Sequence, residues 1–372
     1  MEIKRILIAN RGEIALRALR TIKEMGKEAV VVYSTADKDA LYVRYADVAI
    51  CIGKERSSDS YLNIPAIISA AEISEADAIF PGYGFLSENQ NFVEICSHHK
   101  LKFIGPSVAA MALMSDKSKA KQMMQRAGVP VIPGSDGAVA DTKAAKELAK
   151  QIGYPVILKA AAGGGGRGMR VVECEEDIEK AFWSAESEAM SAFGDGTMYM
   201  EKYILNPRHI EVQIIGDSHG NVLHIGERDC SMQRRHQKLI EESPAILLDD
   251  DTRARLHETA IRAAKAIDYE GAGTFEFLVD KNLDFYFIEM NTRLQVEHCV
   301  SEMVSGLDII ELMIKVAQGE ALPPQESITL KGHAIECRIT AEDPNTFTPS
   351  PGKITKYVCP GGRNVRMDSH IY

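Results

Sequence analysis

The sequence predicts a mixed α/β and α+β fold, and three patterns carry this prediction. Short apolar strands alternate with amphipathic helices up to about residue 114, which predicts βαβ units and a parallel sheet. After about residue 203, strand patterns follow one another across short turns, which is typical of antiparallel hairpins. Between these regions, four consecutive glycines at 163–166 stand between two strand-like stretches. With 372 residues, the chain is long enough for two or three domains.

Composition and charge argue against several classes of protein. Hydrophobic residues make up 45% and charged residues 26% of the chain, as in an ordinary globular protein. The net charge of −10 argues against a general nucleic-acid or membrane-surface binder. No apolar run approaches the ~18 residues of a membrane span, and the N-terminal run is too short for a signal peptide. The seven cysteines are scattered without a CxxC pair, so we expect reduced core cysteines in a cytoplasmic protein of bacterial type.

The first segment is expected to form a parallel sheet. A strand at 4–10 precedes a helix at 11–26, which ends at a glycine suited to cap it, and a second strand lies at 28–34. A further helix at 61–74 leads to a strand at 76–89 that runs into the glycine-rich turn "PGYGFLSEN". A short strand then begins at residue 102.

The next helix is expected to begin near Ser115 and to end before Gly128. Lys117 lies in its first turn, where the helix dipole disfavours a cation. An external anion such as a phosphate would explain this position, and a solvated lysine is the alternative.

Later elements are predicted to be hairpins and one helix. One hairpin joins 208–217 to 222–230, and another joins 273–280 to 284–291. A helix is expected at 303–319, and the stretch 332–344 is expected to open a further strand-rich piece. We expect the chain to stop before that last domain is complete.

The glycine run has three possible functions: a flexible linker, a dinucleotide-binding turn, or a loop over phosphates. Linkers are polar on both sides, whereas both flanks here resemble strands. Gly163, Gly165 and Gly168 match GxGxxG, but that motif needs a helix directly after it, and a strand pattern follows. The remaining explanation is a glycine turn between antiparallel strands. The N–H groups of such a turn carry no side chains beside them and can approach a polyphosphate near Lys159.

Two acidic residues lie on adjacent predicted strands. Strand alternation puts Glu276 on one face with Thr274, and it groups Glu289 with Asn291. If the strands pair, two carboxylates and an amide oxygen can face one cavity and suit Mg²⁺. Solvent-facing strand positions are the alternative.

Three basic motifs suggest an anion pocket. In "NTRLQVEH", Arg293 offers a planar fork and Glu297 a possible general base, although a solvated helix start explains the same residues. The cluster "RDCSMQRRHQK" lacks the interleaved aromatic residues of a nucleic-acid patch, and a solvated strand edge is its other explanation. Arg338 lies on the inner face of a predicted strand and needs an anionic partner.

Seven motifs in order resemble those of the biotin carboxylase family over essentially all of residues 1–372. They are "IANRGEIA", "PGYGFLSEN", "KAAAGGGGRGMR", "RDCSMQRRHQK", "GTFEF", "FIEMNTRLQVEH" and "AEDPNTFTPSPGKI". The resemblance implies an ATP-grasp architecture with an N-terminal Rossmann-like domain at 1–114. It further implies an ATP-grasp domain at 115–330 with a glycine-loop lid at 129–203. A C-terminal domain would begin at 331 and be truncated, because the family continues for several dozen residues.

The resemblance also implies residue roles. Lys238, Arg293, Glu297 and Arg338 would be catalytic, and bicarbonate would meet Lys238, Arg293, Gln295, Val296 and Arg338. Tyr83 would border the biotin pocket, and Glu276, Glu289 and Asn291 would hold Mg²⁺ or Mn²⁺. ATP would be bound by Lys117, Lys159, Gly165, Gly166, Glu201, Lys202, Tyr203, Ile204, His209, Gln233, His236, Glu276 and Glu289.

The implied reaction is the ATP-dependent carboxylation of biotin through carboxyphosphate, as in fatty acid biosynthesis. The chain has no Met-Lys-Met attachment sequence, so biotin would arrive on a biotin carboxyl carrier protein. Carboxyltransferase subunits and a second copy of the chain would be further partners. Acetyl-CoA is the first expected acceptor, with pyruvate or propionyl-CoA as alternatives. A carbamoyl-phosphate synthetase-like ligase and a non-catalytic nucleotide-binding subunit are the rival classes.

Overall fold

The computed structural model describes residues 2–160, 168–235 and 237–371, which form two compact units. The first unit holds the described residues within 1–127, 209–276 and 289–372. The second unit holds those within 128–208 and 277–288.

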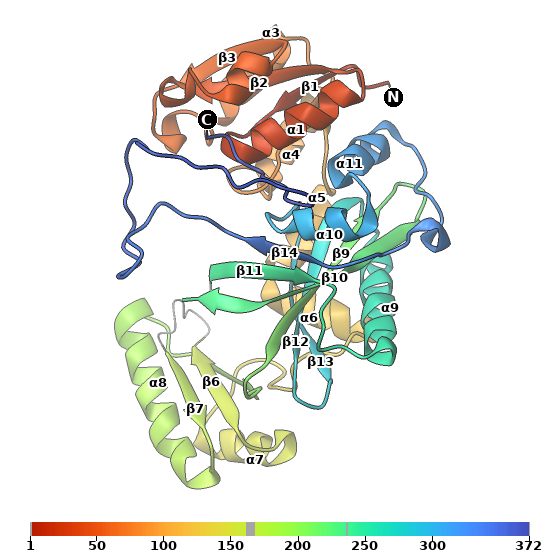
Figure 1. Cartoon of the computed structure of the whole chain (residues 1–372). Coiled ribbons are helices and arrows are strands. Elements are labelled where there is room, and N and C mark those ends of the chain that lie inside the picture. Colours follow the sequence, from red (N-terminus) through yellow and green to blue (C-terminus); the bar gives the residue numbers. More distant parts are fainter. Residues whose placement is uncertain (1, 161–167, 236, 372) are drawn as a thin grey trace. The chain divides into compact units, whose positions relative to one another are not determined.

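The first unit begins with a five-stranded sheet in the order β3-β2-β1-β4-β5 (Figure 1). All its paired strands are parallel, which confirms the predicted βαβ organisation. Alternate residues of β1 pack into different cores, since Ile6 and Ile8 contact residues of α1 while Leu7 packs with residues of α3 and α4. The elements are β1 (Arg5–Ile8), α1 (Gly12–Glu24), β2 (Glu28–Ser34), α2 (Leu41–Tyr45), β3 (Val48–Gly53), α3 (Ile64–Ile73), β4 (Ala78–Phe80), α4 (Gln90–His98), β5 (Lys102–Phe103) and α5 (Val108–Ser115), with 3-10 turns at Thr35–Asp37 and Ser57–Asp59.

A six-stranded sheet follows in the order β13-β12-β9-β10-β11-β14. The predicted antiparallel pairing of the first hairpin is confirmed by the register of β9 against β10. The acidic run at 249–251 caps a helix, because the side chain of Asp249 accepts a hydrogen bond from the backbone N–H of Thr252. The elements are α6 (Lys117–Arg126), β9 (Arg208–Gly216), β10 (Val222–Arg234), β11 (Gln237–Ser243), α9 (Asp250–Ala266), β12 (Gly271–Val279), β13 (Phe285–Asn291), α10 (His298–Ser305), α11 (Ile309–Gln318), a 3-10 turn (Gln325–Ser327) and β14 (Ala334–Cys337).

The second unit is built on a three-stranded antiparallel sheet in the order β7-β6-β8. Strands β6 (Val156–Ala160) and β7 (Met169–Val172) flank the glycine run, which confirms that it joins antiparallel strands. Helices α7 (Thr142–Ile152) and α8 (Ile178–Phe193) lie against this sheet with β8 (Met198–Lys202), and a 3-10 turn covers Glu175–Asp177 (Figure 1). The run 163–166 itself lies outside the described residues.

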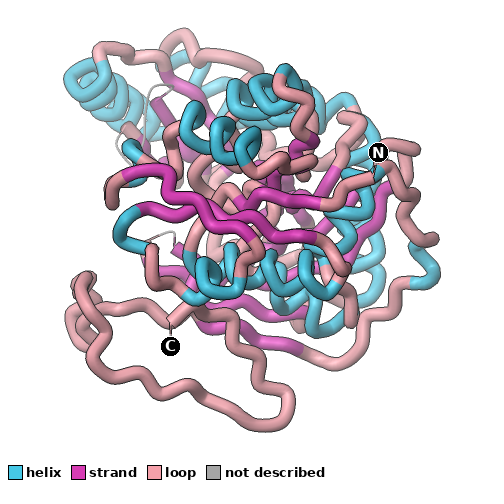
Figure 2. Tube along the Cα trace, turned by 90° about the horizontal axis from the view of Figure 1, so that it is seen from above, coloured by secondary structure: helices cyan, strands magenta, loops and turns pink. Residues whose placement is uncertain are grey.

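Three sequence predictions are wrong. The strand expected to open at 332–344 is present as β14, but the strand-rich piece is not, because no helix or strand follows within residues 338–371, which Figures 1 and 2 draw as loop. The helix expected at 303–319 is two helices, since Gly306 ends α10 in a left-handed conformation.

The third wrong prediction concerns the thiols. All seven cysteines are free, but Cys51, Cys337 and Cys359 are exposed rather than in the core. Cys51 points outward from β3, which is an edge strand of the first sheet.

No described helix is long and apolar enough to cross a membrane.

A buried ionic cluster connects β10 to α9. Glu227 is completely buried, and its carboxylate accepts from Arg253 Nε at 2.9 Å and lies 2.6 Å from His257 Nε2. The His224 ring stacks on the His257 ring with 4.0 Å between their centroids. Burial and the neighbouring His257 lower the pKa of His224 to about 4.

Because of this cluster, we expect the free energy of unfolding to fall in acid. The folded pKa of His224 lies below its unfolded value of 6.5, so the unfolded chain binds more protons between these values and stability falls as pH drops below 6.5. Between pH 7 and pH 5, the free energy of unfolding should fall by about 2 kcal/mol through this group. Urea unfolding of His224→Gln should show a shallower pH slope than wild type. The exposed control His98→Gln should keep the wild-type slope, and equal slopes for both variants would contradict the assignment.

Candidate functional site

One lysine in the first unit lies among three buried carboxylates from different segments. Lys238, on β11, donates from Nζ to Glu211 Oε2 at 2.5 Å, to Glu297 Oε1 at 2.8 Å and to Glu276 Oε1 at 2.9 Å. Glu211 lies on β9 and Glu276 on β12, while Glu297 is the residue that precedes α10. All three carboxylates are at most 4% exposed.

Lys238, Glu211 and Glu276 stay ionised because their opposite charges compensate burial. Burial alone would raise the pKa of Glu211, but Arg228 and Lys238 lower it to about 2. Burial also opposes ionisation of Glu276, whereas a hydrogen bond from His209 and the charge of Lys238 lower its pKa to about 2. The carboxylates in turn raise the pKa of Lys238 against its desolvation. The site therefore presents a fixed ammonium group surrounded by fixed carboxylates.

Glu297 accepts from a second cation. Arg338 Nη2 donates to Glu297 Oε2 at 2.8 Å, and Arg338 Nε donates to Glu241 Oε1 at 2.7 Å. Glu336 lies directly across the strand pair from Glu241, and burial together with Glu241 and Glu297 raises the pKa of Glu336 to about 8. Arg338 thus lies between two carboxylates, which supplies the anionic partner that the sequence predicted for it.

Arg293 belongs to the same constellation through Asn291. Its Nη2 donates to Asn291 Oδ1 at 2.8 Å, and its Nε donates to Glu88 Oε2 at 2.9 Å. Asn291 Nδ2 donates to Glu276 Oε1 at 2.7 Å, so the guanidinium is linked to the carboxylate cluster. Gln295 Nε2 also donates to Glu276 Oε1, at 2.9 Å.

The predicted cation ligands are only partly assembled. Glu276 and Asn291 are in contact, whereas no described residue forms a hydrogen bond or ion pair with the half-buried carboxylate of Glu289. Two carboxylates and one amide suit a hard cation, and the low pKa of Glu276 keeps that ligand ionised. In this structure the amide turns its NH₂ group toward Glu276, so joint ligation requires the amide to turn and to release Arg293.

Other predicted residues take up separate positions. His209 Nε2 lies 2.9 Å from Glu276 Oε2, and Gln233 Nε2 donates to the carbonyl of Cys230 at 2.9 Å. Lys117 is exposed and is the first residue of α6, which confirms its predicted place in the first turn, and the side chain of Asp116 caps that helix. The hydroxyl of Tyr83 donates to the carboxylate of Glu13, a contact that the sequence did not predict.

Val296 follows Gln295 in the turn before α10. Its carbonyl accepts from His298 Nδ1 at 3.1 Å. The donor role of its N–H group stays a prediction.

The second unit holds the remaining predicted ATP-binding residues. Lys159 Nζ donates to Glu201 Oε2 at 2.6 Å. Lys202 Nζ donates to the carbonyls of Gly153 and Tyr154, at 2.9 and 2.8 Å. Its own N–H and that of Tyr203 donate to the carbonyls of two prolines. Ile204 is buried.

Three predicted residues, Gly165, Gly166 and His236, lie outside the described part of the chain. Sequence reasoning missed the roles of Glu88, Arg228 and Glu241. For Glu211 a signal existed, because strand alternation placed it on one face with His209.

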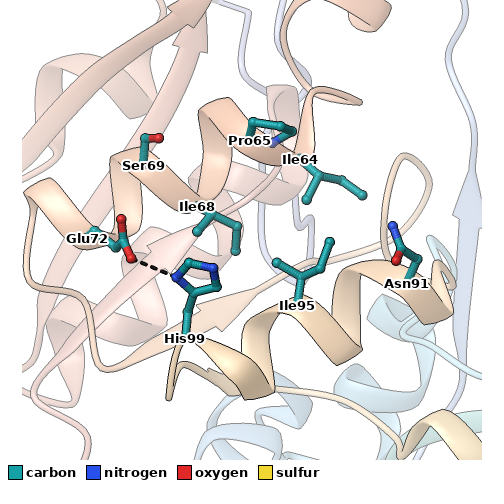
Figure 3. A pocket seen from close by; sticks show the side chains of 8 residues that line it. All are labelled: Ile64, Pro65, Ile68, Ser69, Glu72, Asn91, Ile95 and His99. Carbon is teal, nitrogen blue, oxygen red and sulfur yellow. Dashed lines mark hydrogen bonds and ion pairs between the residues drawn. The ribbon is translucent and has the colours of Figure 1, made fainter.

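A hollow with apolar walls lies elsewhere, between α3 and α4 of the first sheet (Figure 3). Ile64, Ile68 and Ile95 line it, and His99 pairs with Glu72 at its rim. It contains none of the predicted site residues.

Comparison with protein families matches three successive parts of the chain. Residues 2–111 match the N-terminal domain of biotin carboxylase, and residues 336–372 match its C-terminal domain. Residues 116–325 match the ATP-binding domain of the carbamoyl-phosphate synthase L chain.

Individual relatives cover the whole chain. It is 57% identical to a biotin carboxylase of Nostoc sp. over 100% of this chain and 84% of the relative. A crystal structure of a biotin carboxylase complex with β,γ-ATP from Campylobacter jejuni is 85% identical, with a TM-score of 0.90, over 100% of this chain and 83% of that one. The biotin carboxylase domain dimer of Hydrogenobacter thermophilus 2-oxoglutarate carboxylase, in complex with MgADP, ADP and bicarbonate, is 50% identical with a TM-score of 0.85. That match covers 97% of this chain and 80% of the other.

The antiparallel sheets and the ionic site, together with these matches, define an ATP-grasp enzyme. The chain belongs to the biotin carboxylase family, a family of carboxylating ligases. The activity of this family is the ATP-dependent carboxylation of biotin.

Proposed function

We propose that this chain phosphorylates bicarbonate with ATP and transfers the resulting carboxyl group to biotin on a separate biotin carboxyl carrier protein. The observation that carries this proposal is Glu297, a buried carboxylate held between Lys238 and Arg338. Two cations converge there on a carboxylate, so the same donors suit the bicarbonate anion. The relatives with bound β,γ-ATP and bound MgADP with bicarbonate support this assignment.

Each charged group has a distinct part in the proposed reaction. Glu297 takes the proton of bicarbonate, and the freed oxygen attacks the γ-phosphorus of ATP while the bond to ADP breaks. Lys238 and Arg293 hold the anion during this attack, with Gln295 and the N–H of Val296 as neutral donors. Carboxyphosphate then yields CO₂ and phosphate, and phosphate takes the ureido proton of biotin. Arg338 and Arg293 stabilise the biotin enolate that attacks CO₂.

Nucleotide binding is proposed for a further set of residues. Lys117 and Lys159 are suited to the phosphates, together with the N–H groups of Gly165 and Gly166. Glu276, Glu289 and Asn291 would hold Mg²⁺, or Mn²⁺, which screens phosphate charge when bound. We assign the remaining contacts with ATP to Glu201, Lys202, Tyr203, Ile204, His209, Gln233 and His236.

The proposal extends to partners. We propose a homodimer, supported by the dimer of the Hydrogenobacter relative, and carboxyltransferase subunits as the next enzymes in the complex. Acetyl-CoA is the proposed final acceptor, and Tyr83 is proposed to border the biotin pocket.

The direct test is ADP release from Mg-ATP and bicarbonate, measured with and without free biotin. We expect a rate that requires bicarbonate and rises when biotin is added. A rate that requires bicarbonate but ignores biotin would indicate a carbamoyl-phosphate synthetase-like ligase instead. ATP binding without turnover, also in a longer form of the chain, would indicate a non-catalytic nucleotide-binding subunit.

A further inference from the structure

Arg228 is a fully buried cation directly behind the ionic site. Its side chain is 0% exposed, so it cannot touch a substrate itself. All three of its nitrogens donate hydrogen bonds, from Nε to Glu211, from Nη1 to Gln213 and Ser301, and from Nη2 to Thr274 and Gln295. The five distances lie between 2.7 and 3.2 Å.

The bond to Gln295 fixes which end of its amide faces the site. Arg228 Nη2 donates to Gln295 Oε1 at 2.8 Å, and the other end of the amide, Nε2, donates to Glu276 Oε1 at 2.9 Å. A guanidinium has no acceptor atom. If the amide of Gln295 turned over, its Nε2 donor would face the Nη2 donor of Arg228, and neither could accept a hydrogen bond. Gln295 therefore presents a donor, and never an acceptor, toward the carboxylate cluster.

The same guanidinium holds the lysine of the site through Glu211. Arg228 Nε donates to Glu211 Oε1 at 2.7 Å, while Glu211 Oε2 accepts from Lys238 Nζ at 2.5 Å. Each carboxylate oxygen thus has its own cation. Arg228 also supplies the leading attraction that keeps the pKa of Glu211 low despite its burial.

We propose that Arg228 is a positioning residue for the bicarbonate site, acting mainly through Gln295. This inference rests on the proposed function. With the amide fixed, an incoming anion meets the donor of Gln295 beside the ammonium of Lys238. A reversed amide would meet the anion with its oxygen, which repels it.

The test compares Arg228→Lys with Ser301→Ala. The lysine keeps the positive charge beside Glu211 but lacks the planar fork that orients the amide. We expect Arg228→Lys to raise the KM for bicarbonate about tenfold, a loss of the size of one hydrogen bond, with the KM for ATP within about twofold. Ser301→Ala removes another partner of the guanidinium and should leave both constants within about twofold. An unchanged bicarbonate KM, or an equal rise in both constants, would overturn the proposal.

A double-mutant cycle separates positioning from general loosening. In the Gln295→Ala background, Arg228→Lys should add less than about threefold to the bicarbonate KM, whereas multiplicative effects would show that Arg228 does not act through Gln295. If Arg228→Lys fails to fold, Gln295→Glu keeps an acceptor for Arg228 and removes the donor. A normal bicarbonate KM in that variant would equally overturn the proposal.

Binding of ¹³C-bicarbonate, followed by NMR line broadening in the presence of Mg-ADP, gives the same comparison without turnover. If wild type binds bicarbonate but releases no ADP, the proposed function fails while Arg228 is still tested. If wild type binds no bicarbonate, both proposals fail together with the anion site.

Discussion

Replacing Glu297 by glutamine is expected to lower bicarbonate-dependent ADP release by about 10²- to 10⁴-fold, the range typical of losing a general base. An amide cannot take the proton of bicarbonate, while its size matches the carboxylate. The two cations that contact Glu297, Lys238 and Arg338, each keep another carboxylate partner. We therefore expect a folded protein whose kcat falls much more than its KM for ATP rises.

The matched control for this experiment is Glu258→Gln, an exposed glutamate on α9. It removes the same charge from the chain and should keep the wild-type rate. Steady-state ADP release and urea unfolding of both variants form the measurement. If Glu297→Gln retained more than about a tenth of the wild-type rate, the base would have to be another group.

Much of the fold follows from patterns in the sequence. The unbroken apolar run Val30–Val32 predicts a strand buried on both faces, and these residues are fully buried in the parallel sheet. The strands on both sides of the glycine run were likewise predicted from their own apolar residues. The structure of the segment after Cys337 was not predicted correctly. An apolar alternation becomes a strand only where a neighbouring strand can pair with it.

The site is less accessible from sequence, because its contacts join distant segments. Lys238 touches residues 27, 38 and 59 positions away along the chain, and no spacing rule connects them. Resemblance to a family predicted these residues, whereas periodicity supplied only single strand faces.

Arg228 shows the same difficulty more sharply. Its basic neighbours suggested an anion pocket, yet its guanidinium is buried and neutralised inside the protein. Lys202 is another example, because its ammonium group binds two carbonyls of its own unit and no pattern in the sequence indicated these partners. Burial of a charge depends on partners that only the folded chain brings together.

Replacing Lys238 by methionine is expected to have the largest effect on stability, and it should also abolish bicarbonate-dependent ADP release. The substitution leaves Glu211, Glu276 and Glu297 buried without the cation that they share. Removing one partner of a buried ion pair costs about 3–5 kcal/mol, which should appear as a lower free energy of unfolding at pH 7.5. Lys281→Met, in an exposed turn, is the matched control and should unfold like wild type.

The pH dependence identifies the cause of that loss. In wild type, the pKa values of Glu211 and Glu276 are about 2, below the unfolded value of 4.5, so their contribution is present above pH 4.5 and is lost in acid. Without Lys238 the desolvated carboxylates should have raised pKa values, and their contribution would then be lost as pH rises. The stability difference between wild type and Lys238→Met should therefore shrink between pH 7.5 and pH 5. Urea unfolding at both pH values decides the matter, since a difference that stays constant would mean that lost packing, and not unpaired charge, causes the destabilisation.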